Sequence, residues 1–327
     1  MDVGVVGLGN LGAAIANLVV GNGHRVIGWE YDERVVAEIN DAHVNSRFLP
    51  GVVLDANLVA TTALREVFER AETVFVALPS VFIRKTLAPF AEQVKRDTAI
   101  VNLAKGIERA TGLTSFQMIA ELFPTNPKIM LSGPSIANEF ARGMPTVVMI
   151  AGSSTTSLLA VAQLLDNRHF RVRFSDDAIG VELGGILKNA YAIGLGMFDG
   201  QQIESVNFRS VYLTLAIEEM ARIGVSLGAQ KETFAYLAGL GDLLATSLSQ
   251  ASHNRRMGML LGTGHSLSEI ERTMGVLPEG YNTIQTILMI AEKFHVPAPL
   301  AKGLWDVING RYGAERFIYA FIHDFVD

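Results

Sequence analysis

The chain has 327 residues, 49% hydrophobic and 18% charged, which predicts a folded protein of two domains rather than a disordered chain. Its formal net charge of -6 argues against a nucleic-acid-binding protein with a broad basic surface, and the absence of cysteine excludes disulfides and thiolate catalysis. We find no signal peptide and no apolar run of about 18 residues, so we expect a cytoplasmic protein that does not insert into a membrane.

A glycine-rich turn follows the first predicted strand. Residues 3–6 are typical of a buried strand, and Gly7-Leu8-Gly9-Asn10-Leu11-Gly12 leads from it into a helical pattern over residues 13–20. The first glycine permits a tight turn, the second lets a pyrophosphate approach the backbone, and the third lets helix and strand pack closely. This context predicts a dinucleotide-binding fold, with Gly7, Gly9, Asn10, Leu11 and Gly12 as cofactor contacts.

A carboxylate ends the second predicted strand, over residues 25–29. Glu30 stands about 20 residues beyond the glycine turn, where a carboxylate accepts hydrogen bonds from the adenosine ribose and repels a 2′-phosphate. No arginine takes its place, so we expect NAD as the cofactor in preference to NADP. Asp32 is the alternative acid, and the sequence does not decide between the two. We include the intervening Tyr31 among the expected contacts.

Strands and helices alternate through the N-terminal half, which predicts a Rossmann-type α/β domain with a parallel, doubly wound sheet. We expect further strands over residues 73–78, 99–103, 128–131, 144–152 and 170–174, and helices over residues 84–95, 115–122 and 155–165. Ligands of such sheets bind beyond the carboxyl ends of the strands.

Turn-forming and polar segments occupy three of these strand ends, over residues 78–80, 104–107 and 132–137. Their positions direct them toward the cofactor. We therefore assign Lys105 a role in the site rather than that of a surface lysine, and we place Pro79 among the cofactor contacts.

Helical periodicity dominates from Val181 onward, which predicts an all-α C-terminal domain. We place a dinucleotide-binding domain over residues 1–180 and a helical substrate-binding domain over residues 181–327. Helices are expected over residues 211–223 and 283–295, and polar loops over residues 239–246 and 252–258.

Lys188 introduces one ammonium group into the otherwise apolar, helix-patterned run over residues 180–191. On a helix, Gly184 and Gly185 lie under its side chain and would leave room for a ligand. Close packing by small residues, with a lysine that extends to water, fits the same pattern, and both interpretations stay open. Asp242 needs a partner if it is buried, and a lysine ammonium is the natural one.

Taken in order, these motifs resemble the NAD-dependent glycerol-3-phosphate dehydrogenase family across nearly the whole chain. The matching segments are the glycine turn, residues 45–51, 105–107, 132–135, 180–183 with 188–189, 239–243 with Thr246, Ser252 with 254–256, and 278–280. The resemblance implies an active site between a Rossmann-type domain and a helical domain, a homodimer, and a place in glycerophospholipid metabolism.

The resemblance also implies roles for individual residues in the reversible reduction of dihydroxyacetone phosphate, a small phosphorylated substrate. Lys188 would be the acid/base, with Lys105 and Asp242 as further catalytic residues and no metal ion. Further substrate contacts would be Lys105, Gly133, Ser135, Asn189, Thr246, Ser252, His253, Asn254 and Arg255. Further cofactor contacts would be Lys105, Ala137, His253 and Glu279. An ammonium group can protonate and stabilise the developing alkoxide, which agrees with these roles.

His253 is the main departure from the family pattern, which has an arginine before Asn254. A histidine cannot form the same bidentate contact with a phosphate and is only partly charged near neutral pH. Three functions stay open. The first is oxidoreduction of glycerol 3-phosphate, with Arg255 or protonated His253 in place of the arginine. The second is a divergent enzyme for another small oxo phosphate, phosphonate or carboxylate, and the third is a non-catalytic dinucleotide-binding sensor.

Overall fold

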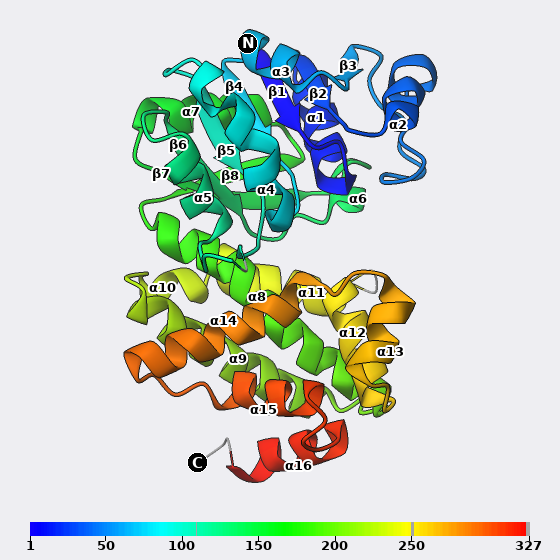
Figure 1. Ribbon diagram of the computed structural model, residues 1–327, viewed down its shortest axis with the longest axis vertical. Coiled ribbons are helices and arrows are strands. Elements are labelled where there is room, and N and C mark those ends of the chain that lie inside the picture. The colour runs from blue at the N-terminus through cyan, green and yellow to red at the C-terminus, as the bar shows by residue number, and fades with distance from the viewer. Residues whose placement is uncertain (109, 250–251, 325–327) are drawn as a thin grey trace. The chain divides into compact units, whose positions relative to one another are not determined.

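The computed structural model describes residues 1–108, 110–249 and 252–324. The chain divides into two compact units, Met1–Val181 and Glu182–Asp327 (Figure 1). No helix in the described part of the chain combines the length and the apolar character needed to cross a bilayer.

Eight strands form one sheet in the first unit, in the order β3-β2-β1-β4-β5-β6-β7-β8. Their bounds are β1 Asp2–Val6, β2 Arg25–Trp29, β3 Leu58–Thr61, β4 Thr73–Val76, β5 Ala99–Asn102, β6 Lys128–Ser132, β7 Thr146–Gly152 and β8 Phe170–Ser175. The predicted Rossmann-type α/β fold is confirmed by this sheet and its helices.

The prediction of a wholly parallel sheet is wrong at one pair of strands. β6 and β7 run antiparallel, with Ile129 opposite Gly152. The segment between them holds only the four-residue helix α6, Ala137–Phe140. Such a helix spans about 6 Å, whereas a five-residue strand spans about 16 Å, so this connection lacks the long helix that usually covers the sheet in a parallel crossover.

Strand β3 was not expected from the sequence, because it is only four residues long and borders the sheet. It nevertheless has a direct bearing on the predicted cofactor site. The Glu30 amide donates to the Thr61 carbonyl at 3.0 Å, so the end of β3 fixes the backbone of the acid that follows β2.

Both faces of the sheet are buried, as a doubly wound fold requires. Successive residues of β1 show this: Val5 belongs to one apolar cluster and Val6 to another. The first cluster includes helices α1 (Asn10–Gly21) and α7 (Thr155–Leu165). The second includes α3 (Leu64–Arg70), α4 (Ser80–Leu87) and α5 (Ser115–Leu122).

The helix expected over residues 84–95 is two elements. Helix α4 ends at Leu87, and a 3-10 helix, η2, follows over Ala88–Gln93. Pro89 stands in the first turn of η2 and cannot supply the amide hydrogen that a continuous α-helix needs. Two other elements complete this unit: α2 over Glu33–Ala37 and a π-helical turn, η1, over Glu38–Ala42.

The second unit is helical in its described part. Its elements are α8 Ala178–Gly200, which begins just before the boundary, α9 Val206–Ser226, α10 Lys231–Phe234, the π-helical turn η3 Leu237–Gly241, α11 Asp242–Leu248, α12 His253–Gly262, α13 Leu267–Met274, α14 Glu279–Phe294, α15 Pro299–Ile308 and α16 Ala314–Asp324.

Both segments predicted as polar loops are helical instead. Residues 239–246 fall in η3 and α11, and residues 253–258 begin α12. Ser252 accounts for the second difference, because its side chain accepts from the Arg255 amide and caps α12. Gly239 accounts for part of the first: a Cβ there would lie 2.2 Å from the Phe234 carbonyl oxygen, so this glycine serves close packing rather than a loop.

Helix α8 is buried all round from Gly180 to Phe198. A Cβ at Gly184 would lie 2.6 Å from the Ala238 carbonyl oxygen, so backbone fills the space that was expected for a ligand. The packing interpretation therefore holds for Gly184. The expectation that Lys188 extends to water is wrong, because it is only 8% exposed.

Glycines also set the crossing of α8 and α12. A Cβ at Gly196 would lie 1.9 Å from the Arg255 carbonyl oxygen, and one at Gly258 would lie 1.8 Å from the Ile193 carbonyl oxygen. Each glycine therefore accepts the backbone of the other helix, and α12 is fixed in position along α8.

We expect Gly196→Ala to force these two helices apart and to lower the free energy of unfolding by about 3 kcal/mol, the upper part of the usual cost of overpacking. Urea unfolding would measure the change. Gly21→Ala is the matched control, because a Cβ at this last residue of α1 meets no atom within 4 Å and should change stability by less than about 1 kcal/mol. An unchanged midpoint for Gly196→Ala would contradict the close crossing.

Candidate functional site

The three glycines of the turn after β1 differ in their surroundings. Gly7 has a φ of 97°, a conformation that side chains disfavour. A Cβ at Gly12 would lie 1.8 Å from the Gly7 carbonyl oxygen, so α1 packs directly on the turn. A Cβ at Gly9 would meet no atom within 4 Å, which leaves its backbone open to a ligand. This is the division of roles that a pyrophosphate-binding turn requires.

A cavity of about 1100 Å³ opens beside this turn, within the first unit. Five residues predicted as cofactor contacts line it: Gly7, Gly9, Glu30, Tyr31 and Pro79. Leu78, from the segment 78–80 that was expected to face the cofactor, also lines it, and apolar side chains that were not predicted form much of the remaining wall: Trp29, Phe48, Leu64, Phe82 and Phe90. A cavity that is mostly apolar, with few polar groups, is typical of cofactor sites.

Glu30 rather than Asp32 lines the cavity. Glu30 is 4% exposed, and its Oε1 accepts from the Tyr31 and Asp32 amides at 2.9 and 3.3 Å. Asp32 instead caps helix α2 and forms ion pairs with Arg34 and Arg47 at 3.2 and 3.0 Å. The sequence left the choice between the two acids open, and the structure favours Glu30, because Glu30 lines the cavity and Asp32 does not.

Arg47 and Phe48 form a part of the cavity wall that the sequence did not indicate. The Asn45 side chain donates to the Leu8 carbonyl at 2.8 Å, and the Arg47 guanidinium lies 4.8 Å from the centre of the Phe48 ring. Arg47 and Phe48 line the cavity, together with the cations Arg65 and Lys85. The family motif over residues 45–51 contains both residues, but its pattern does not indicate which of its side chains line a cavity.

Asn10 and Leu11 do not line the cavity. The Asn10 side chain donates through Nδ2 to the Phe48 carbonyl at 2.6 Å and to Asn138 Oδ1 at 3.0 Å. Leu11 packs against the apolar cluster on its face of the sheet. In this structure Asn10 thus holds residues 45–48 against the glycine turn.

Lys105 and Ser135 meet at one backbone oxygen. Lys105 Nζ donates to the Gly133 carbonyl at 3.1 Å, and Ser135 Oγ donates to the same carbonyl at 3.0 Å. Ala137 is buried at the start of α6, four residues after Gly133. The structure therefore brings together three of the residues that were expected beyond the ends of β5 and β6.

In the second unit, Lys188 lies between a carboxylate and a hydroxyl group. Its Nζ is 2.5 Å from Asp242 Oδ1 and 2.6 Å from Thr246 Oγ1. Asp242 is 2% exposed, so the ion pair is shielded from water. The predicted partnership of Lys188 and Asp242 is confirmed. Such a pair presents an ammonium group whose position is fixed by two oxygen atoms.

Two further predicted residues, Asn189 and Asn254, form a second polar contact. Asn254 Nδ2 donates to Asn189 Oδ1 at 3.0 Å, while Asn254 Oδ1 accepts from the Gly280 amide at 2.8 Å. Asn189 follows Lys188 on α8, and Glu279 is the first residue of α14. Asn254 therefore ties α12 both to the helix that carries Lys188 and to the start of α14.

Arg255 and His253 differ in their availability to a ligand. Arg255 pairs with Asp199 through Nε and through Nη2, the latter at 3.0 Å, and its Nη1 donates to the Ser247 carbonyl at 2.7 Å. His253 is exposed at the first position of α12. Arg209 also pairs with Asp199, at 2.7 Å. Asp199 thus connects α8, α9 and α12, a role that no sequence pattern indicated.

Burial raises the pKa of the Asp199 carboxyl, but the hydrogen bonds from Arg255 and Arg209 outweigh this and hold that pKa below its usual value. Among residues 1–108, 110–249 and 252–324, no group of three or more acidic or histidine side chains could hold a metal ion.

The chain matches two family models: the N-terminus of NAD-dependent glycerol-3-phosphate dehydrogenase over residues 2–157 and its C-terminus over residues 177–319. It is 37% identical over 310 residues to glycerol-3-phosphate dehydrogenase (NAD(P)+) of Carboxydothermus hydrogenoformans, covering 94% of this chain and 92% of that one. It is 39% identical over 308 residues to the protein of that name from Acinetobacter baylyi, covering 94% and 86%.

Among solved structures, the glycerol-3-phosphate dehydrogenase of Coxiella burnetii superimposes with a TM-score of 0.91 at 28% identity and covers 98% of each chain. The resemblance inferred from the sequence motifs is thus confirmed over both halves of the chain.

We expect Asp199→Asn to lower the free energy of unfolding at pH 7 by about 1–3 kcal/mol, because Arg255 and Arg209 lose a charged acceptor. Because the pKa of Asp199 is lower in the folded than in the unfolded protein, its ionised carboxylate stabilises the fold above about pH 3.8. This stabilisation is lost as the pH falls through the folded-state pKa. The difference between variant and wild type should therefore shrink in thermal unfolding below about pH 3.8.

Asp2→Asn is the control, since the ion pair of Asp2 with Arg25 is more exposed, and its effect at pH 7 should be much smaller. A difference for Asp199→Asn that stays constant down to pH 3 would contradict the assigned cause.

Proposed function

The chain belongs to the NAD-dependent glycerol-3-phosphate dehydrogenase family and is an NAD(P)-dependent dehydrogenase acting on a CH-OH group, and on this basis we propose that it interconverts dihydroxyacetone phosphate and glycerol 3-phosphate. The observation that carries the proposal is the buried contact of Lys188 with Asp242 and Thr246. A buried ammonium with two fixed oxygen partners is suited to deliver a proton at one defined place.

Lys188 is the proton donor in the direction of reduction. The nicotinamide, when bound, supplies a hydride to the carbonyl carbon. The proton on Lys188 Nζ passes to the carbonyl oxygen, which becomes the hydroxyl of glycerol 3-phosphate, and Lys188 is left neutral. The Asp242 carboxylate stabilises the ammonium form beforehand, and the charge on Nζ stabilises the developing alkoxide.

The substrate phosphate is held near the start of α12, by His253 in its protonated form. Arg255 is less suited, because Asp199 and the Ser247 carbonyl already occupy its nitrogen atoms. Asn254 supports the arrangement through its contacts with Asn189 and Gly280. Lys105 is a further proposed substrate contact, and its Nζ donates to the Gly133 carbonyl, which also accepts from Ser135.

NAD is the preferred cofactor, because Glu30 lines the cavity beside the glycine turn and a carboxylate there repels a 2′-phosphate. We further propose that the protein is a cytoplasmic homodimer that supplies glycerophospholipid metabolism, as the family membership suggests.

A second candidate is a divergent enzyme that uses Lys188 and Asp242 on another small oxo phosphate, phosphonate or carboxylate. His253 favours it, since an exposed histidine replaces the family's arginine and Arg255 is bound to Asp199. A non-catalytic sensor has less support, because it has no need for the Lys188 contacts.

The proposal is tested by following NADH oxidation with dihydroxyacetone phosphate, beside NADPH and unphosphorylated dihydroxyacetone. We expect saturable turnover that requires the phosphate and favours NADH. Lys188→Ala should lower turnover by about 10²- to 10⁴-fold, the usual worth of positioned proton transfer, and leave the dissociation constant for NADH nearly unchanged. Lys302→Ala removes an exposed lysine that pairs with Asp306, and this variant should be active.

Turnover by Lys188→Ala at the wild-type rate would remove Lys188 from the role of proton donor. No turnover of dihydroxyacetone phosphate by the wild type, with NADH binding intact, would favour the divergent enzyme.

We expect His253→Arg to lower KM for dihydroxyacetone phosphate by about tenfold, because a permanent, bidentate cation replaces a partly charged ring. Steady-state kinetics with dihydroxyacetone phosphate would measure KM of variant and wild type. Equal values of KM would show that residue 253 does not hold the phosphate.

A further inference from the structure

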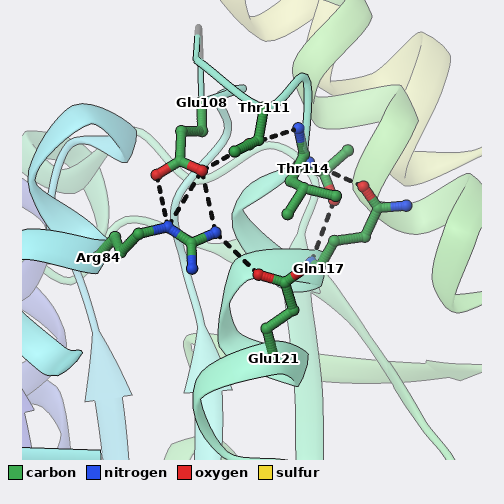
Figure 2. Close-up of polar contacts among 7 residues, drawn as sticks. Arg84, Glu108, Thr111, Thr114, Gln117 and Glu121 are labelled. Atoms are coloured by element: carbon green, nitrogen blue, oxygen red, sulfur yellow. Dashed lines mark hydrogen bonds and ion pairs between the residues drawn. The ribbon is translucent and has the colours of Figure 1, made fainter.

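The loop between β5 and α5 carries Lys105 and is fastened at a distance from that residue. Glu108, three residues further along, turns its carboxylate toward Arg84 of α4 (Figure 2). From this arrangement we propose that Arg84 is a positioning residue for Lys105, acting through Glu108. The inference rests on the proposed function only in that Lys105 contacts the substrate.

The Arg84 guanidinium joins three parts of the first unit. Its Nε lies 2.8 Å from Glu108 Oε1, and its Nη2 lies 3.0 Å from Glu108 Oε2. The same Nη2 donates to Glu121 Oε2 on α5 at 2.9 Å. Figure 2 shows the guanidinium between the two carboxylates, so that one planar side chain connects α4, the loop and α5. A two-point contact fixes direction as well as distance.

Glu108 is bound from the loop side as well. Thr111 Oγ1 donates to Glu108 Oε2 at 2.5 Å, and the Leu113 amide donates to Thr111 Oγ1 at 3.2 Å. The Glu108 amide donates to the Leu113 carbonyl at 2.8 Å, which closes the loop on itself. The carboxylate of Glu108 thus transmits the position of Arg84 to the backbone of the loop.

The base of the loop is fixed close to Lys105. The Asn102 side chain bonds to both the amide and the carbonyl of Ala104, at 3.1 Å each. The Ser115 hydroxyl donates to the Gly106 carbonyl at 2.9 Å. Lys105 therefore lies between Ala104 and Gly106, which are both held by hydrogen bonds. Glu108 is the third residue of the loop that is held, through Arg84.

The charges of this contact persist over the working pH range. Hydrogen bonds from Arg84 and then Thr111 hold the pKa of the Glu108 carboxyl below its usual value. Those from Glu108 and then Glu121 raise the pKa of Arg84. Arg84 and Glu108 therefore both stay charged over this range, and the ion pair does not act as a pH switch.

Helix α4 also forms part of the cofactor cavity. Phe82, Lys85 and Thr86 line that cavity, whereas Arg84 on the same helix bonds to the Lys105 loop. One short helix thus contributes to the wall of the cavity and holds the loop. Through these contacts, α4 sets the position of Lys105 relative to the cavity.

The test uses the full chain with Arg84→Gln and Glu108→Gln, which remove one charge each at nearly constant size. KM for dihydroxyacetone phosphate should rise about five- to tenfold, as expected when a networked, partly exposed ion pair is lost. The dissociation constant for NADH should change less than KM does, since neither side chain lines the cavity. The double variant should be no worse than either single one, because both act through one contact.

Two readouts do not depend on turnover. Amide hydrogen exchange over residues 103–108 and 110–114 should become faster in both variants, and the rate at which acetic anhydride modifies Lys105, followed by mass spectrometry, should change. Arg25→Gln is the matched control: it breaks an exposed two-point ion pair, with Asp2, and should leave KM, exchange and labelling unchanged.

Faster exchange with unchanged KM and unchanged labelling would overturn the inference, because order in the loop would then not matter to Lys105. Unchanged exchange in both variants would overturn it as well. If the wild type does not turn over dihydroxyacetone phosphate, the proposed function fails instead, and exchange with Lys105 labelling still decides whether Arg84 positions the lysine.

Discussion

A buried ammonium group is the constraint on which the second unit depends. Lys188 lies on a helix that is enclosed from Gly180 to Phe198, where an unpaired charge would be strongly destabilising. The chain meets this demand by bringing η3 and α11 against α8, with Gly184 under the Ala238 carbonyl and Asp242 at 2.5 Å from Nζ. Gly184 therefore lets the segment that carries Asp242 pack closely against α8.

The first unit places its charged groups in a comparable way, through backbone contacts. Glu30 is held by its own following amides and by the end of β3, and Lys105 sits in a loop that is bonded at both ends. In both units, segments that carry predicted site residues are held by contacts that the sequence did not indicate, made by Thr61, Asp199 and Arg84.

The sequence was sufficient for the fold class, the glycine turn and the pairing of Lys188 with Asp242, because each follows from local pattern or from the cost of burying charge. It was not sufficient for the antiparallel β7, because no pattern in the sequence fixes the direction of a strand after a connection without a long helix. Nor did it reveal that residues 239–246 and 253–258 are helical, since glycines there fit a neighbouring helix and Ser252 caps α12. Contacts between distant residues, such as Arg255 with Asp199, leave no periodic signal.

The close approach of α8 and α12 has an evolutionary consequence. With Gly196 against Arg255 and Gly258 against Ile193, neither helix accepts a side chain at the crossing without moving the backbone of the other. Substitutions are therefore tolerated only where a side chain has room to change, and the exposed first position of α12 is such a place.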